Sequence, residues 1–140
     1  MKKILFLGGG IHLESLAKEA KKRKLQIYLI DFVKEPFLKK YSYDFFYANL
    51  RNKSTCLKIA KKIKPNFIIT DQNDNAMETY SHLCLKLNRP GIPISTVKVF
   101  TNKYLCKKKL SRNKLTTKFI RDFKLINLKQ LNYQSFKNKI

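Results

Sequence analysis

The sequence predicts an α/β protein with a Rossmann-like parallel sheet flanked by helices, and three observations support this prediction. Short apolar runs without helical period, which suit strands buried on both faces, recur at residues 3–7, 26–31 and 66–71. Segments with apolar residues at helical spacing separate these runs, at intervals too long for hairpins. The chain has 140 residues, the usual size of one domain, and 44% of them are hydrophobic. Strands and helices that alternate in this way form right-handed βαβ units.

The first two predicted strands enclose one helix. Lys-Ile-Leu-Phe-Leu at residues 3–7 forms the first strand, and three glycines follow it directly. The next helix ends in the basic stretch 21–24, which suits a helix C-terminus. The second strand, QIYLID, covers residues 26–31 and ends in Asp31. The apolar face of the helix between them consists of Leu13, Leu16, Ala17 and Ala20.

The second half of the predicted sheet follows Pro36. Residues 44–47 suit a short third strand, and Ser54 is expected to cap the helix that stops before Pro65. NFIITD at residues 66–71 is the next strand. The two helices on either side of it have one apolar face each, formed by Cys56, Ile59, Ala60 and Ile63 and by Ala76, Tyr80, Leu83, Cys84 and Leu87.

The pattern changes after Pro93. Two short helices are expected, the first capped by Ser95 or Thr96 and the second by Thr101. TTKFI at 116–120 suits a strand, and residues 121–140 are polar and irregular. We therefore divide the chain into a domain at residues 1–95 and a C-terminal linker region at residues 96–140.

The net charge is +22, from 31 Lys and Arg residues against 9 Asp and Glu residues. Such a charge is typical of nucleic-acid-binding proteins, which remain one alternative for this chain. However, most of the basic residues are lysines, whereas bidentate recognition of bases and phosphates favours arginine. The lysines are also spread along the whole chain. We therefore expect only non-specific, salt-sensitive binding to nucleic acid.

The cysteines and the hydropathy pattern bear on the compartment. Cys56, Cys84 and Cys106 lie far apart in apolar surroundings, as expected for reduced core residues. No stretch approaches the roughly 18 apolar residues of a membrane span, so no membrane partner is expected. These features favour a cytoplasmic protein.

The triplet Gly8, Gly9 and Gly10 is the first candidate ligand-binding element. Gly8 and Gly10 fit the first two positions of the dinucleotide pattern G-x-G-x-x-G, but the third position is Leu13. Asp31 lies where a ribose-binding acid would follow. Backbone amides before a helix also favour an anion of some kind. The triplet is thus either a ligand-contacting loop or a structural turn, and a free-standing nucleotide- or dinucleotide-binding module is a second alternative function.

Polar side chains cluster in TDQNDNA, residues 70–76, after the fourth strand. Asn73 and Asp74 suit either a helix cap or contacts to a ligand, and the two roles are compatible. His12 is expected to be an exposed residue of a helix's first turn. His82 lies inside a predicted helix without a Cys or His partner for a metal, so we expect no metal site. No Ser/His/Asp set or pair of catalytic carboxylates is visible, and no catalytic residue is assigned.

Several segments, taken in order, resemble a known family. They are the glycine turn, the acidic end of the second strand, the strand Lys64–Thr70, the Gly91-x-Pro93 segment, Asn102-Lys103 and the T-x-x-F-I strand. This order is similar to the N-terminal, pre-ATP-grasp domain of the ATP-grasp ligases, which include carbamoyl phosphate synthase, biotin carboxylase and the carboxylate–amine ligases. The resemblance extends to about Ile120.

The resemblance implies roles for a few residues. Lys103 matches a lysine that contacts ATP phosphate in this superfamily, and Lys107, one turn later, matches a second basic residue near the nucleotide. Gly8–Gly10 and the Asn73–Asp74 region match segments that face the acceptor substrate, a small-molecule carboxylate or amine. The chain would then be the substrate-side domain of an acyl-phosphate-forming ligase.

The chain ends at Ile140, about where the family's next strand would bring a second ATP-binding lysine. The partners that the resemblance implies are therefore the ATP-grasp lobes, which carry the Mg²⁺-binding carboxylates. ATP and Mg²⁺ are expected as cofactors of the full-length enzyme. We expect this chain alone to bind neither tightly and to be inactive.

Overall fold

The computed structural model describes residues 1–71, 73–113 and 115. It contains one four-stranded sheet in the order β3-β2-β1-β4, and every neighbouring pair is parallel. The predicted α/β fold is therefore confirmed. β1 is central, with Leu5 opposite both Tyr28 of β2 and Ile68 of β4. The strands are β1 (Lys3–Leu7), β2 (Gln26–Asp31), β3 (Asp44–Tyr47) and β4 (Phe67–Ile69).

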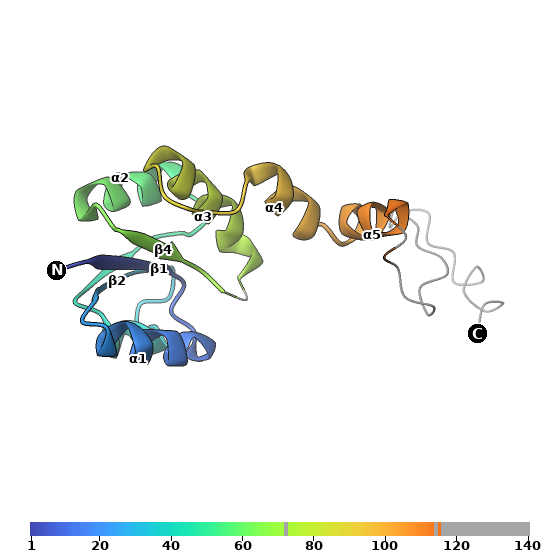
Figure 1. Ribbon diagram of the computed structural model, residues 1–140. Coiled ribbons are helices and arrows are strands. Elements are labelled where there is room, and N and C mark those ends of the chain that lie inside the picture. The colour runs from blue at the N-terminus through green and yellow to red at the C-terminus, as the bar shows by residue number, and fades with distance from the viewer. Residues whose placement is uncertain (72, 114, 116–140) are drawn as a thin grey trace. The chain divides into compact units, whose positions relative to one another are not determined.

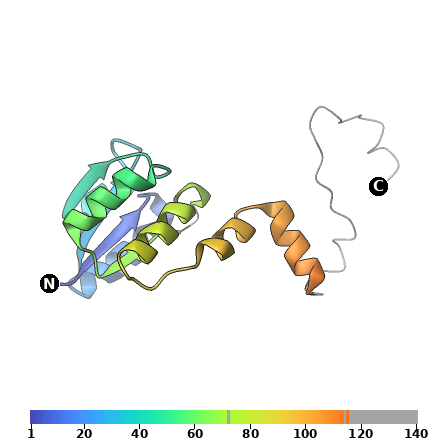
Figure 2. The ribbon, with the colours of Figure 1, turned by 90° about the horizontal axis from the view of Figure 1, so that it is seen from above.

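Helices cover both faces of the sheet (Figure 1). α1 lies on one face, and α2 and α3 lie side by side on the other (Figures 1 and 2). α4 packs on α3. The α-helices are α1 (Glu14–Lys22), α2 (Lys53–Ile63), α3 (Asp74–Lys86), α4 (Ile94–Phe100) and α5 (Lys103–Arg112). Two short 3-10 helices, η1 (Ile11–Leu13) and η2 (Phe37–Tyr41), precede α1 and β3.

The core consists of two apolar clusters, one on each face, because successive strand residues point to opposite sides of a sheet. The cluster on the α1 side contains Phe6, Leu13, Ala17, Ala20, Ile27, Leu29 and Leu38. The α2–α3 side includes Leu5, Leu7, Ile30, Cys56, Ala60, Ala76, Leu83 and Cys84. Cys56 and Cys84 are thus core residues as predicted, whereas Cys106 is half-buried.

One residue of the predicted apolar face of α1 is not in the core. Leu16 is 39% exposed, whereas Leu13, Ala17 and Ala20 are buried. These three residues are four and three positions apart and already form the stripe that faces the sheet. Leu16 lies beside this stripe, so its side chain borders solvent.

The structure corrects the predicted helix caps. α2 begins at Lys53 and is capped by Asn52, whose Oδ1 accepts a hydrogen bond from the Thr55 amide at 3.1 Å. Ser54 lies inside the helix, and its hydroxyl donates to the same Oδ1 at 2.9 Å. Asn and Ser are about equally good caps, so the residue two positions earlier takes the role.

The two helices after Pro93 also begin away from the predicted caps, α4 at least two residues earlier and α5 one residue later. α4 follows Pro93 directly, and neither Ser95 nor Thr96 caps it. Thr101 ends α4, and Asn102 caps α5 by accepting a hydrogen bond from the Leu105 amide at 3.1 Å. A proline suits the start of a helix because the N–H that it lacks would have no partner there.

The chain divides into two compact units, Met1–Thr101 and Asn102–Ile140. The first unit contains the sheet and α1–α4, so α4 belongs to the same unit as the sheet. The second contains α5, none of whose residues is buried. The predicted strand at 116–120 and the tail at 121–140 lie outside the described residues. Within the described part of the chain, none of the helices is long and apolar enough to cross a membrane.

Candidate functional site

The carboxyl edge of the sheet has one topological switch point, between β1 and β4. The chain leaves β1 towards α1 on one face and leaves β4 towards α3 on the other. Ligands of open parallel sheets bind in the crevice that such divergent connections leave. Gly8–Gly10 follow β1 and Thr70–Asn73 follow β4, so the predicted substrate-binding segments flank this point.

Most polar backbone groups of the glycine turn, Gly8–Gly10, are used inside the protein. The Gly8 amide donates to the Ile30 carbonyl at 2.9 Å, and the Gly9 amide donates to Asp31 Oδ2 at 2.6 Å. The Gly9 carbonyl accepts a hydrogen bond from the Leu38 amide at 3.0 Å. Two of the three glycine amides therefore already have protein acceptors.

Asp31 holds the glycine turn from the end of β2. It is 5% exposed, and its second carboxylate oxygen accepts a hydrogen bond from the Val33 amide at 2.9 Å. A ribose-binding acid has to present its carboxylate to the crevice. Asp31 instead binds two backbone amides of its own chain, so its position at the end of β2 reflects a structural role.

Two of the three glycines are required by the geometry. Gly8 has φ +97°, a conformation that L side chains rarely adopt. A Cβ on Gly9 would lie 2.7 Å from the Pro36 Cβ, well inside van der Waals contact. The three atoms nearest to a Cβ on Gly10, the first of them well inside van der Waals contact, all belong to the ring of the exposed residue His12. The His12 ring therefore occupies the space beside Gly10.

The loops after β1 and β4 are joined at the switch point. Thr70 Oγ1 donates to the Leu7 carbonyl at 2.8 Å, and His12 Nε2 lies 3.1 Å from the Asp71 carbonyl oxygen. The side-chain nitrogen of Asn73, Nδ2, lies 3.0 Å from the position that a Cβ on Gly8 would take. Of the predicted substrate-binding residues, the structure thus brings the glycine turn and Asn73 together.

Asp74 lies elsewhere, in a polar cavity of about 320 Å³ that we call the α2–α3 cavity. Its lining comes from the starts of α2 and α3 and from the end of α4. The lining residues are Arg51, Lys53, Asp74, Asn75, Glu78, Thr79 and Thr101. Sequence analysis missed Arg51 and Lys53. The sequence does contain a signal for them. The polar segment NLRNK at 49–53 follows the third strand, and in a parallel sheet this places it at the carboxyl edge, with the glycine turn.

Contacts between α2 and α3 organise the charges of the cavity. Lys53 Nζ lies 2.6 Å from Glu78 Oε2, and this hydrogen bond lowers the pKa of the Glu78 carboxyl. Arg51 Nε donates to Asn75 Oδ1 at 3.0 Å. Arg51 and Asn75 also line a second cavity of about 230 Å³, together with Phe32, Asn49 and Leu50. The two cavities therefore adjoin along the carboxyl edge.

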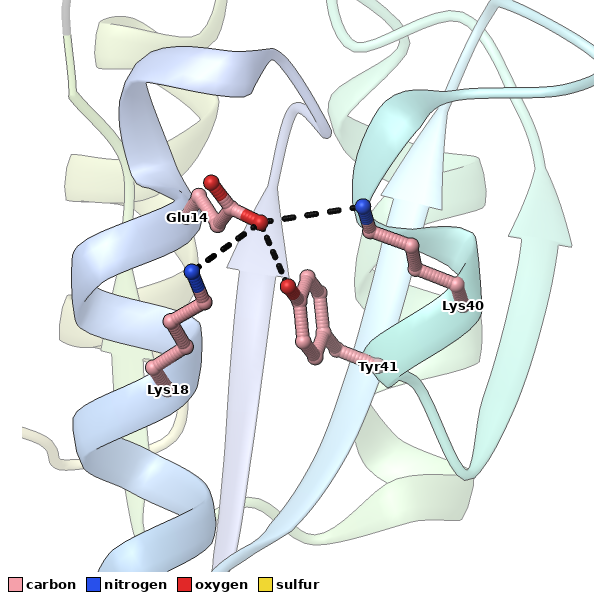
Figure 3. A network of polar contacts seen from close by, with 4 residues as sticks. All are labelled: Glu14, Lys18, Lys40 and Tyr41. Atoms are coloured by element: carbon pink, nitrogen blue, oxygen red, sulfur yellow. Dashed lines mark hydrogen bonds and ion pairs between the residues drawn. The ribbon is translucent and has the colours of Figure 1, made fainter.

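A polar network supports the glycine turn from the α1 side (Figure 3). Glu14 Oε1 accepts a hydrogen bond from the Tyr41 hydroxyl at 2.5 Å and lies 3.4 Å from Lys18 Nζ and 3.6 Å from Lys40 Nζ. The Tyr41 hydrogen bond is the main cause of the lowered pKa of Glu14. The network ties α1 to η2, the element whose Leu38 amide bonds to the turn.

The predicted nucleotide-binding residues lie on α5, in the second unit. Lys103 is its first residue and is exposed, and Lys107 follows one turn later and is half-buried. Cations at these positions suit a phosphate, which the start of a helix also favours. The described residues contain no group of three His, Cys, Asp or Glu side chains that could hold a metal.

Comparisons with known proteins identify the fold. No protein-family model matches the sequence, and no curated protein matches it significantly. Solved structures do match. Phosphoribosylglycinamide synthetase from Anaerococcus prevotii has a TM-score of 0.71 and 18% identity over 81% of this chain. N5-carboxyaminoimidazole synthetase from Staphylococcus aureus, complexed with ADP, has a TM-score of 0.69 and 18% identity over 81%. An L-amino acid ligase from Bacillus licheniformis has a TM-score of 0.66 and 17% identity over 91%.

All three are ATP-grasp ligases, and the match covers their N-terminal portion. The chain spans 29%, 30% and 35% of their respective lengths, about a third of each. At this level of identity the match establishes the fold. The resemblance noted in the sequence is thereby confirmed for the architecture, because the chain folds like the N-terminal domain of ATP-grasp ligases.

Proposed function

We propose that this chain is the N-terminal, substrate-side domain of an ATP-dependent carboxylate–amine ligase. The observation that carries this proposal is that three ligases with different products all match the chain through the same N-terminal third. The order of segments in the sequence supports it independently. The ADP bound by the Staphylococcus aureus structure supports ATP as the cofactor of the complete enzyme.

In this proposal the chain contributes one wall of an active-site cleft. ATP supplies the phosphoryl group that activates a carboxylate for attack by an amine. Gly10 and Asn73 border the switch point and orient the acceptor substrate, a small carboxylate or amine. Lys103 and Lys107 offset the negative charge of the nucleotide phosphates from the start of α5. The metal ligands and the adenine pocket belong to the ATP-grasp lobes, the chain's proposed partners.

The first test is the coding DNA beyond the codon for Ile140. We expect an open frame, or an adjacent gene, that encodes ATP-grasp lobes with a strand-borne lysine and late Glu and Asn metal ligands. The absence of both from the genome would contradict the proposal. Calorimetry with ATP and Mg²⁺ adds a second test, because this chain alone should show no micromolar, Mg²⁺-dependent binding.

Lys103→Ala tests the nucleotide contact in the chain joined to its lobes. Loss of a charge-assisted phosphate contact should raise KM for ATP by about tenfold or more. Lys109→Ala is the matched control, since Lys109 is an exposed lysine on the same helix. Equal effects of the two substitutions would show that the general positive charge matters and that Lys103 has no specific role.

The dinucleotide alternative has its own test. The third glycine of the pattern is missing, and the Asp31 carboxylate is buried against its own backbone. Fluorescence titration with NADH should therefore show no saturable binding at low micromolar concentration. Saturable binding would identify the glycine turn as a dinucleotide site.

A further inference from the structure

The amino edge of the sheet, opposite to the switch point, carries a concentration of positive charge that the proposed ligase role does not use. In Figure 1 this edge lies beside the N-terminus. We propose that the amino edge binds single-stranded nucleic acid without sequence specificity. The proposal is independent of the proposed function, because neither the carboxyl edge nor α5 takes part in it.

Basic residues that lie far apart in the sequence converge at this edge. The four strands are parallel and the helices between them run back the other way, so the strands begin where α1, α2 and α3 end. Residues 2–3, 21–24, 61–64 and 86–89 therefore lie at the amino edge, and we call them the basic rim. They contain eleven Lys and Arg residues and no Asp or Glu.

The acidic residues of the same unit lie mostly at the opposite edge. Only Glu19, in the last turns of α1, and Asp44, at the start of β3, lie near the amino edge. A general enrichment of the sequence in lysine would not separate acidic from basic residues in space. The other six acidic residues of Met1–Thr101 follow strands or lie in the first turns of helices, and they are Glu14, Asp31, Glu35, Asp71, Asp74 and Glu78.

Most charges of the basic rim are open to solvent. Within residues 1–71 and 73–113, Arg23 is the only rim residue in an ion pair, with Glu19 at 2.7 Å. Lys3 Nζ and Arg89 Nε donate to backbone carbonyls at 3.0 and 2.8 Å, so these two half-buried side chains are fixed. All other cations of the rim are exposed. They can therefore reach the phosphates of a bound strand.

Two rim lysines occupy backbone positions that disfavour them. Lys24 and Lys64 end α1 and α2 with φ of +55° and +53°. Glycine or asparagine is usual at such a helix end, because a longer side chain is strained there. Residues 21–22 and 61–62 already place cations in the last turns, where the helix macrodipole favours them. The lysines at 24 and 64 thus add charge against the preference of the backbone.

Exposed aromatic rings lie at the same edge. Tyr43 directly precedes β3 and is 69% exposed, and its ring packs edge-to-face on Tyr28 with 5.6 Å between the centroids. Lys3 Nζ lies 5.6 Å from the centroid of the Tyr28 ring. Phe67, the first residue of β4, is 45% exposed. Unpaired bases stack on such rings, whereas duplex bases are already stacked on one another. The rings therefore favour a single strand over a duplex.

The dimensions and the residue types define the kind of strand. β3 and β4 are the outermost strands of the sheet, three strand spacings or about 14 Å apart. This width accommodates several nucleotides. Lysine contacts phosphates as a point charge and does not read base edges as arginine does. Binding should therefore depend on salt and hardly on sequence.

The experiment is a fluorescence anisotropy titration of a labelled oligouridine of about twelve nucleotides with the full chain. We expect saturable binding with a Kd of about 10 μM or tighter at about 50 mM salt, and a steep loss of affinity as salt rises. An RNA duplex of the same length and vesicles that contain phosphatidylserine should both bind more weakly than the oligouridine.

A double substitution at the left-handed positions separates binding from folding. Lys24→Asn with Lys64→Asn removes two charges, and asparagine tolerates this conformation, so the thermal midpoint should stay the same or rise. Affinity for oligouridine should fall by about tenfold, with a shallower dependence on salt. The matched control is Lys34→Gln with Lys98→Gln, which removes two exposed lysines of the same unit outside the rim. Its affinity should stay within about twofold of the wild type.

Substitutions of Tyr43 test stacking apart from charge. Tyr43→Leu should weaken binding of oligouridine by about fivefold or more and leave binding of the duplex unchanged. Tyr43→Phe keeps the ring and should retain the affinity of the wild type.

Four results would overturn the inference. They are the absence of saturable binding of oligouridine, equal weakening by the two double substitutions, tighter binding of the duplex or of vesicles, and unchanged binding by Tyr43→Leu. None of these measurements involves ATP or the other lobes. The proposed ligase function therefore stands or falls separately.

Discussion

The glycine turn and the α2–α3 cavity lie on the same edge of the sheet but differ in what they offer a ligand. In the turn, the Gly8 and Gly9 amides and the Asp31 carboxylate are bonded to one another or to neighbouring backbone. In the cavity, the Asp74 carboxylate and the Thr79 hydroxyl have no such partner among the described residues. The first region resembles a ligand-binding motif in sequence, whereas the second contains an exposed carboxylate and a buried hydroxyl that no described protein group bonds.

This contrast shows why residue types alone do not identify a ligand site. A polar group acts on a ligand only if the fold has not already satisfied it. Glycine followed by an acid some twenty residues later suggests a dinucleotide, yet here the pair is a hydrogen bond between Gly9 and Asp31. Substitutions in the turn should therefore change stability more than those in the cavity.

The largest expected effect is that of Gly9→Ala. The new Cβ would lie 2.7 Å from the Pro36 Cβ and 3.2 Å from Leu29 Cδ2, so the turn has to shift. We expect a loss of about 3 kcal/mol in the free energy of unfolding, measured in urea. Gly10→Ala is the comparison, because its Cβ would displace the exposed His12 ring and with it the contact to the Asp71 carbonyl, and its cost should be smaller, about 1 kcal/mol or less. Equal losses would mean that the turn is not locked by Pro36.

The second-largest effect is expected for Asp31→Asn. It should lower the free energy of unfolding by about 2 kcal/mol, because it weakens a buried, charge-assisted hydrogen-bond acceptor. The amide side chain offers one acceptor oxygen in place of two, although the Gly9 and Val33 amides both need one. Asp71→Asn, on an exposed side chain at the same edge, should cost little. If Asp31→Asn leaves the free energy of unfolding unchanged, the carboxylate is available for a ligand.

The Glu14 network should make stability depend on acid. The hydrogen bond from Tyr41 lowers the folded-state pKa of Glu14 below 4.5, so ionised Glu14 favours the folded state. This contribution is present above the unfolded pKa and is lost as pH falls through the lowered folded pKa. The wild type should therefore lose stability on acidification faster than Glu14→Gln, in urea titrations from neutral pH to pH 3. Parallel curves for the two proteins would contradict the role of this network.

The smallest effect on stability is expected at the cavity. Lys53→Met removes the ion pair with Glu78 but keeps the aliphatic stem. Both side chains are exposed to about the same extent, 40% and 44%, so the cost should be about 0.5 kcal/mol or less in thermal or urea unfolding. A loss as large as that of Gly9→Ala would mean that the Lys53–Glu78 pair is an essential structural contact between α2 and α3.

The fold was predictable because its signals are local. Strands buried on both faces read as apolar runs, and the helices show apolar residues on one face, which suffices for a parallel sheet. The caps were less predictable, since Asn52 and Ser54 are equally suitable and only the backbone path decides between them. The prediction that Leu16 is buried was wrong for a similar reason. A helix can rotate slightly about its axis without any change in the spacing of its apolar residues.

The site was predictable only in part. The sequence placed Gly8–Gly10 and Asn73 at one edge, and parallel strands bring them together there. It could not show that the Asp31 carboxylate turns towards Gly9. Nor could it show that the side chains of adjacent residues Asn73 and Asp74 lie in different places, one beside Gly8 and one in the α2–α3 cavity, because that depends on the start of α3. The roles of Lys103 and Lys107 stay predictions.

β1 precedes both of its neighbours in the sequence, so its two edges find their partner strands at very different times during synthesis. Ile4 pairs with Ile27 of β2 on one edge and with Phe67 of β4 on the other, and Phe67 is synthesised some forty residues after Ile27. Contacts between residues so distant in sequence slow folding. Until β4 is synthesised, one edge of β1, a strand that is apolar except at Lys3, stays unpaired, and unpaired strand edges favour aggregation.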